Sequence, residues 1–216
     1  MTLMNYQYSG TPPKNSYLSD KKDILATYAD WSNTYEQEYY NEQGNRIPYI
    51  LSDLFAQYVP LETKASVLDA GAGTGYLGKV LREKGFNDLG LHAVDLSEDM
   101  LSHVEEKDIY TSAMWADLEE LPFKENMFDH CISSAVIGLV PATVFSELIR
   151  VTKPGGYILF NLRDQYYESG EAPFKKQMEA LESSGAWEIV AQQGPEEVFA
   201  NPHFHALYYF FVYKVR

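Results

Sequence analysis

Short apolar runs alternate with amphipathic segments along most of this chain. The apolar runs predict strands at residues 66–69, 90–95, 110–115, 128–133 and 157–161. Helical spacing predicts helices at residues 24–41, 48–58, 76–84 and 144–151, and one more after Ser97. Strands and helices that alternate in this way form a parallel sheet, and its ligands bind at the carboxyl ends of the strands.

The last part of the chain has a different pattern. Residues 174–183 have helical spacing, whereas 187–192 and 205–215 predict two strands in succession. Because only a loop separates these two strands, we expect an antiparallel pair at the end of the sheet. Residues 1–19 are polar and without period, so we expect a flexible N-terminal arm before a single domain at residues 20–216.

A glycine-rich turn follows the first predicted strand. Asp69 ends the strand, and Gly71, Gly73 and Gly75 occupy alternate positions before a helix that begins at Tyr76. Glycine permits positive φ angles and lets a ligand approach the backbone without a Cβ atom in the way. The N-terminus of the following helix favours a negative group. This turn is therefore the first candidate for a ligand site.

Two classes of ligand compete for this turn. Residues 73–78 satisfy the G-x-G-x-x-G pattern, so an NAD(P)-dependent oxidoreductase is one alternative. Asp69 argues against it, because a carboxylate would repel a pyrophosphate and attract a ligand that carries an ammonium and a sulfonium. S-adenosylmethionine carries both groups. A glycine turn that binds nothing is the remaining alternative.

The stretch VLDAGAGTG at residues 67–75 resembles motif I of the class I S-adenosylmethionine-dependent methyltransferases, and the resemblance continues in order to about Phe160. It implies that the methionine end of the cofactor is lined by Asp69, Ala70, Gly71 and Gly73. The expected terminal strand pair also fits this family. The resemblance thus implies an α/β fold, with a Rossmann-like doubly wound seven-stranded sheet that is mostly parallel and has an antiparallel last strand.

Asp95 ends the second predicted strand, 26 positions after Asp69. Its two oxygens can accept hydrogen bonds from both hydroxyls of a ribose, and an acid is found near this spacing in related folds. The alternative role, a helix cap, is less favoured because Ser97 can fill it. Leu96 and Met100 would then cover the adenine, although both could equally belong to the core.

The family places its adenine contacts after the third strand, where this chain has Ala116, Asp117 and Leu118. Asp117 would accept from the exocyclic amine while the backbone N–H of Leu118 donates to a ring nitrogen. A surface aspartate is the alternative. Ser133, Ser134 and Ala135, which end the fourth strand, would lie beside the methyl group.

Three aromatic residues, Tyr28, Trp31 and Tyr35, share one face of the first predicted helix. They could pack on the sheet, or form part of a helical lid at residues 20–60 whose rings contact the sulfonium. The stretches YADWSNTYEQEY and FKKQMEALESSGAWE resemble the Williams-Beuren syndrome region methyltransferase-like proteins. That resemblance implies cofactor binding and a transferase, leaves the acceptor open, and is weak past Pro195.

Methyl transfer mainly requires that nucleophile, carbon and sulfur be held in line, so no general base is needed. We assign no catalytic residue. Asn161, Arg163 and Asp164 follow the fifth strand and could touch a substrate, without an assigned role. The motifs that mark nucleic-acid amines and arginine as acceptors are missing, which favours a small molecule or another protein side chain. A non-catalytic adapter that binds the cofactor remains an alternative.

Charge and composition narrow the partners. The formal net charge is −14 and no local basic patch is visible, so we expect no nucleic-acid partner. Cys131 is the single cysteine and cannot form an intrachain disulfide. No secretory signal and no apolar run of about 18 residues is seen. We expect a cytoplasmic protein without membrane or metal, and make no prediction of its oligomeric state.

Overall fold

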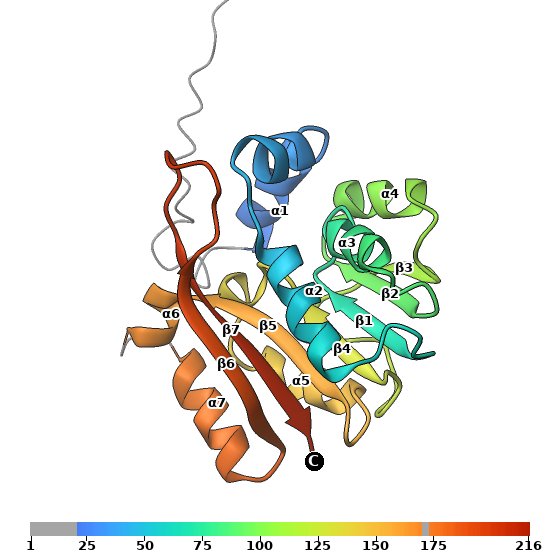
Figure 1. The fold of residues 1–216 in the computed structure, drawn as a ribbon, viewed down its shortest axis with the longest axis vertical. Coiled ribbons are helices and arrows are strands. Elements are labelled where there is room, and N and C mark those ends of the chain that lie inside the picture. The colour runs from blue at the N-terminus through green and yellow to red at the C-terminus, as the bar shows by residue number, and fades with distance from the viewer. Residues whose placement is uncertain (1–20, 170–172) are drawn as a thin grey trace, which may run out of the picture.

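The structure is a computed structural model that describes residues 21–169 and 173–216. Its seven strands form one sheet in the order β3-β2-β1-β4-β5-β7-β6 (Figure 1). They are β1 (Ser66–Ala70), β2 (Gly90–Asp95), β3 (Ser112–Trp115), β4 (His130–Ser133), β5 (Tyr157–Arg163), β6 (Trp187–Glu197) and β7 (Leu207–Val215). The first five are parallel, and β7 runs antiparallel to both β5 and β6. The predicted fold is confirmed, while the expected arm at 1–19 lies outside the described residues.

Helices cover both faces of this sheet. They are α1 (Lys21–Trp31), the π-helix η2 (Glu36–Glu42), α2 (Ile47–Tyr58), α3 (Tyr76–Lys84), α4 (Glu98–Glu106), the 3-10 helix η3 (Ile137–Leu139), α5 (Val144–Val151), α6 (Asp164–Glu168) and α7 (Phe174–Ser183). In Figure 1, α2 crosses in front of the sheet and α1 lies beyond its upper edge. None of the helices in the described part of the chain is long and apolar enough to cross a membrane.

Two apolar layers result from the alternation of side chains along the strands. Val67 of β1 packs with Phe55 of α2 on one face. The next residue, Leu68, belongs to the layer of Phe145 and Phe174 on the opposite face. Successive residues of a strand point to opposite faces, so both neighbours in β1 are buried against different helices. Burial of each such side chain contributes about 1.5–3 kcal/mol.

The segment before the sheet differs from the single helix predicted at 24–41. It divides into α1 and η2, with a turn between them at residues 32–34. The turn has the sequence Ser-Asn-Thr, and side chains of these types compete for backbone hydrogen bonds. Ser32 does so here, since its Oγ donates to the carbonyl of Ala29 at 2.9 Å. No residue of α1 is buried, whereas α2 is part of the core.

Several predicted strand boundaries also differ: β1 and β5 end one and two residues later than predicted, and β7 begins two residues later. Three further differences have a visible cause. β3 begins at Ser112 rather than 110, because Tyr110 packs beneath α3. β4 begins at His130, and Phe128 forms only an isolated bridge with Thr152. β6 continues past Gln192, where its apolar pattern ends, because β7 still offers backbone partners. It does so through two irregularities in register.

Candidate functional site

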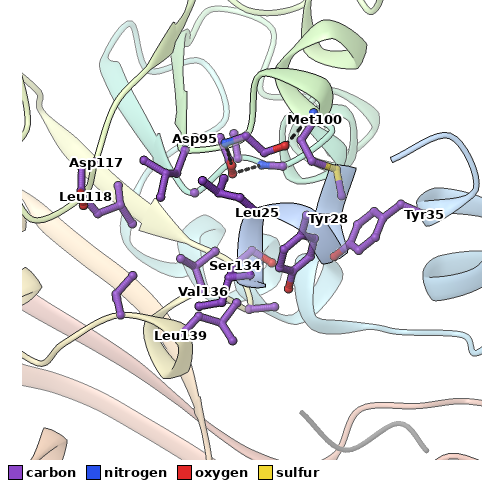
Figure 2. A pocket seen from close by; sticks show the side chains of 18 of the residues that line it. Leu25, Tyr28, Tyr35, Asp95, Met100, Asp117, Leu118, Ser134, Val136 and Leu139 are labelled. Atoms are coloured by element: carbon purple, nitrogen blue, oxygen red, sulfur yellow. Dashed lines mark hydrogen bonds between the residues drawn. The ribbon is translucent and has the colours of Figure 1, made fainter. Parts of the chain in front are cut away.

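A pocket of about 950 Å³ lies at the carboxyl ends of β1, β2 and β4, with α1 and η2 on its outer side (Figure 2). This is the edge at which parallel sheets bind ligands. Of the residues singled out from the sequence, the pocket wall contains Tyr28, Tyr35, Gly71, Gly73, Asp95, Leu96, Met100, Asp117, Leu118, Ser134 and Ala135. The fold thus brings together residues from segments far apart in the chain.

The first two glycines of the turn serve different purposes. Gly71 has φ of 76°, and a Cβ atom there would lie 2.5 Å from the side chain of Val136. Gly73 has φ of 54°, yet a Cβ atom would meet nothing within 4 Å. Gly71 therefore permits close packing of the loop at residues 135–140, and Gly73 leaves backbone open to the pocket.

Asp95 ties the glycine turn to the start of α4. Its Oδ2 accepts from the backbone N–H of Gly73 at 2.8 Å, and its Oδ1 accepts from the N–H of Ser97 at 2.9 Å. Burial raises the pKa of Asp95, and these backbone donors oppose the rise. Each carboxylate oxygen has two lone pairs, so both can accept one further donor from the pocket. Ser97 caps α4, as predicted, by accepting from Met100 N at 3.3 Å.

Asp69 lies close to the turn but not in the pocket wall. Its side chain is on the α2–α3 face of β1, the face of Val67, and points beneath the start of α3. There its Oδ2 accepts from the Tyr110 hydroxyl at 2.5 Å, while its Oδ1 is buried and has no hydrogen-bond partner within the described ranges. Burial raises the pKa of Asp69 to about 7, with the Tyr110 hydrogen bond opposing and the charge of Asp95 adding. A permanent anion facing the ligand, as expected from the sequence, is therefore not what the structure places here.

Four other expected contacts also lie outside the wall. Ala70 and Ala116 belong to the apolar layer on the α5 side of the sheet. Ser133 is fully buried, and its Oγ donates to the Ala70 carbonyl at 2.8 Å. Trp31 packs edge-on to Tyr35, and its Nε1 donates to Glu38 at 2.8 Å. These four side chains do not line the pocket, and they affect it only by packing against or bonding to residues near it.

Asp117 reaches the pocket with its carboxylate already paired. Lys21 Nζ lies 2.5 Å from Asp117 Oδ2 and 2.5 Å from Glu119 Oε2. The other oxygen, Oδ1, accepts from the Glu119 backbone N–H at 3.0 Å. Burial raises the pKa of Asp117, but the hydrogen bonds from Lys21 and from the Glu119 N–H, together with the charge of Lys21, outweigh it, so the pKa is below its usual value. The first turn of α1 is thus connected to the loop after β3.

The outer wall comes from aromatic and apolar side chains of α1 and η2. Leu25 and Tyr28 of α1 face Asp95 and Leu118 across the pocket (Figure 2). Tyr40 of η2 stacks on Tyr76 with a centroid distance of 3.7 Å, which connects this wall to the start of α3.

Several lining residues were not anticipated: Lys21, Ile24, Leu25, Tyr40, Ala72, Leu77, Ser97, Val136, Leu139 and Val140. A signal existed for part of α1, since Lys21, Leu25 and Tyr28 are spaced by four and three and share a helix face. No comparable pattern marks residues 135–140, which form a turn and the short η3. In the described ranges no group of three or more His, Cys, Asp or Glu could hold a metal.

Comparisons with known proteins agree with this geometry. Residues 68–160 match the model of a family described as a methyltransferase domain. Human methyltransferase-like protein 27 is 33% identical over 181 residues, which cover 79% of this chain and 71% of the human protein. Malonyl-[acyl-carrier protein] O-methyltransferase of Hamiltonella defensa is 33% identical over 154 residues, 68% of this chain and 55% of that protein.

The chain therefore spans about half the length of the malonyl-[acyl-carrier protein] O-methyltransferases that it matches. Among solved structures, the PH0226 protein from Pyrococcus horikoshii OT3 has the same fold. It superposes with a TM-score of 0.62 at 20% identity, covering 91% of this chain and 100% of that one.

Proposed function

Because the chain belongs to the class I S-adenosylmethionine-dependent methyltransferases, we propose that it binds S-adenosylmethionine in the large pocket and transfers its methyl group to a small molecule or a protein side chain. One observation carries the proposal. The open backbone at Gly73 and the carboxylate of Asp95 meet at one edge of the sheet, beside the apolar side chains of Leu96, Met100 and Leu118.

These residues fit the parts of the cofactor in order. Asp95 keeps capacity for two donors, which suits the two hydroxyls of a ribose. The side chains of Leu96 and Met100 offer apolar surface to an adenine ring. Gly71 and Gly73 present backbone without side chains to the methionine end. When bound, S-adenosylmethionine supplies a methyl carbon that its sulfonium activates for displacement.

Asp117 and Leu118 are assigned to the adenine amine and ring, with one condition. The Asp117 Oδ2 that would accept from the amine is paired with Lys21. Adenine therefore shares this carboxylate with Lys21 or displaces it. We propose that α1 and η2, rather than the whole of 20–60, form the lid, because α2 is packed in the core. Tyr28 and Tyr35 would then exclude water and face the sulfonium.

A dinucleotide fits the turn less well. A pyrophosphate is held by backbone N–H groups of a glycine turn, but most of these already donate within the protein. Gly71 and Ala72 donate to the Val94 carbonyl, Gly75 donates to Ala72, and Gly78 donates to the hydroxyl of Tyr110. Gly78 also has a packing role, since a Cβ atom there would lie 2.3 Å from that hydroxyl.

Titration calorimetry separates these readings. We expect S-adenosylhomocysteine to bind the purified chain, and NAD⁺ and NADH not to bind at the same concentrations. Binding of NAD(H) without binding of S-adenosylhomocysteine would overturn the proposal.

A second experiment tests transfer. The protein is incubated with methyl-labelled S-adenosylmethionine and with separate small-molecule and protein fractions of a cell extract. We expect label in one of the two fractions. Binding of S-adenosylhomocysteine without transfer to either fraction would instead favour a non-catalytic adapter.

A further inference from the structure

A second, smaller cavity adjoins the large pocket. It has about 270 Å³ of space and shares Ala135 and Leu139 with the large pocket. Its remaining wall comes from η3, the end of β5, α6 and β7, through Gly138, Asn161, Arg163, Tyr166 and Tyr208. Gly138 lets the Tyr166 ring come close, since a Cβ atom there would lie 2.8 Å from that ring. A group held in this cavity would lie beside the methionine end of the neighbouring pocket.

Asn161 turns a hydrogen-bond donor toward this cavity. Its side chain is 1% exposed, and its Oδ1 accepts from the backbone N–H of Ala135 at 2.8 Å. That bond fixes which end of the amide is the oxygen, because an N–H needs an acceptor. The opposite end, Nδ2, is buried and has no hydrogen-bond partner among the described residues. Buried polar groups are rarely left unpaired, so this donor indicates a missing acceptor.

Arg163 adds a positive charge with the same requirement. It lies two residues after Asn161 in β5, on the same face of the strand. The residue is 7% exposed, and Nη1 of its guanidinium is buried without a hydrogen-bond partner in the part of the chain that the structure describes. Within the described residues, 21–169 and 173–216, Arg163 forms no ion pair. A buried guanidinium is costly unless an anion pairs with it.

We propose that this cavity is the acceptor subsite and that it binds a carboxylate of the methyl acceptor through Arg163 and Asn161. This inference rests on the proposed function, because an acceptor subsite has meaning only beside a methyl donor. The guanidinium presents a planar pair of donors that matches the two oxygens of a carboxylate.

Charge and size favour a carboxylate over a phosphate. Among the described residues, Arg163 is the one charged residue in the cavity wall, so a single negative charge is balanced there and a dianionic phosphate is not. The cavity has less than a third of the space of the large pocket, which suits one small group at the end of an acceptor. The rest of the acceptor would extend past Ala135 and Leu139 toward the large pocket.

Calorimetry with small probes tests this subsite on the full chain saturated with S-adenosylhomocysteine. The probes are butyrate, the uncharged butyramide of the same shape, and methyl phosphate. We expect butyrate to bind at least about tenfold more tightly than butyramide, as one charge-assisted hydrogen bond would give. Methyl phosphate should bind more weakly than butyrate.

Three variants locate the effect. Arg163→Met should lower butyrate affinity by about tenfold or more, and Arg163→Lys by less, since it keeps the charge and loses the planar donors. Asn161→Asp keeps an acceptor for the Ala135 N–H but adds a negative charge to the cavity. It should therefore abolish butyrate binding without lowering the melting temperature. This variant still tests the subsite if Arg163→Met does not fold.

The affinity for S-adenosylhomocysteine separates failure of this inference from failure of the proposed function. Arg163 is not in the wall of the large pocket, so Arg163→Met should leave that affinity within about twofold. If S-adenosylhomocysteine does not bind the wild-type chain, the proposed function is wrong. If it binds, but butyrate binds no better than butyramide or methyl phosphate binds most tightly, the carboxylate subsite is wrong and the proposed function stands.

Discussion

The two sides of the large pocket are held in place by different interactions. On the sheet side, Gly71 and Gly73 have positive φ, and Asp95 accepts hydrogen bonds from the turn and from the start of α4. On the helix side, α1 has no buried residue, and its first turn is connected to the pocket by the ion pair of Lys21 with Asp117. The sheet side belongs to the core of the fold, whereas α1 on the helix side only packs against its surface.

This difference indicates how the pocket works. Backbone hydrogen bonds and glycine conformations are fixed when the sheet forms, so the sheet side is organised before a ligand arrives. Exposed ion pairs contribute about 0–1 kcal/mol, so the first turn of α1 can leave its place at small cost. A ligand of this size in a covered pocket needs such a movement in order to enter. Variants on the two sides should therefore differ in kind and in magnitude.

The largest expected effect is on the sheet side, from Gly71→Ala. The change imposes a left-handed conformation on a residue with a Cβ atom and places that atom 2.5 Å from Val136. Backbone strain of about 1–2 kcal/mol and overpacking of about 1–3 kcal/mol should lower the free energy of unfolding by roughly 2–5 kcal/mol. Urea denaturation measures this loss in the free energy of unfolding.

Gly73→Ala is the matched control for that change. It carries the same kind of backbone strain but meets no atom within 4 Å, so it should cost only about 1–2 kcal/mol. Equal losses for the two variants would mean that contact with Val136 does not organise this side of the pocket.

Asp69 should give the sheet side a distinctive pH dependence. The folded protein keeps a proton on Asp69 up to about pH 7, whereas the unfolded chain releases it near the ordinary pKa of 3.8. Between these values the folded state binds more protons, so stability falls as pH rises, by at most about 1.4 kcal/mol per pH unit. Asp69→Asn removes this titration and should gain stability relative to wild type from pH 4 to pH 7.

Urea denaturation at several pH values measures that difference. Asp88→Asn, at an exposed position after α3, serves as the control and should show a constant difference from wild type. A constant difference for Asp69→Asn as well would show that the carboxyl is ionised throughout, as expected from the sequence.

The contrast between the two sides also explains what could be predicted from the sequence. The glycines, Asp95 and the succession of strands and helices along the chain follow from local rules of backbone conformation and chain period, so they could be predicted. The direction of the Asp69 side chain depends on which face of β1 it occupies. The sequence does not show which helices pack on that face, and the structure shows that they are α2 and α3. The partners of Lys21 lie 96 and 98 positions away in the chain, and no local pattern connects them.

Other features were out of reach for similar reasons. The predicted helix at 24–41 breaks where three short polar side chains compete for backbone hydrogen bonds. The spacing of apolar residues, on which the prediction was based, does not report this competition. Arg163 was noted in the sequence without a role, since its meaning depends on burial and on the missing partner. The role of Arg163 is decided by packing between distant segments, whereas the break in the helix is a local effect of its polar side chains.

A smaller effect than that of Gly71→Ala is expected from Asp95→Ala. The variant removes acceptors for the turn, for Ser97 and for the proposed ribose, and should weaken S-adenosylhomocysteine binding by more than about tenfold, or 1.4 kcal/mol. Asp99→Ala is the control, because Asp99 is exposed in the first turn of α4 and does not line the pocket. Calorimetry measures both. An unchanged affinity for Asp95→Ala would remove the ribose assignment.

The smallest effect on affinity is expected on the helix side, from Lys21→Met. The ion pairs of Lys21 are partly exposed, with 46% of its side-chain surface accessible, so their loss should change the S-adenosylhomocysteine affinity by less than about threefold. The rates should change more, because α1 opens more often once Asp117 no longer holds it. Stopped-flow tryptophan fluorescence should show faster association and faster dissociation. High salt should shift the association and dissociation rates of the wild type toward those of the variant, since salt screens exposed ion pairs.

Lys176→Met, on the exposed face of α7, is the control and should leave the rates unchanged. A tenfold loss of affinity in Lys21→Met would instead place the first turn of α1 among the groups that hold the ligand, and the two sides of the pocket would no longer differ.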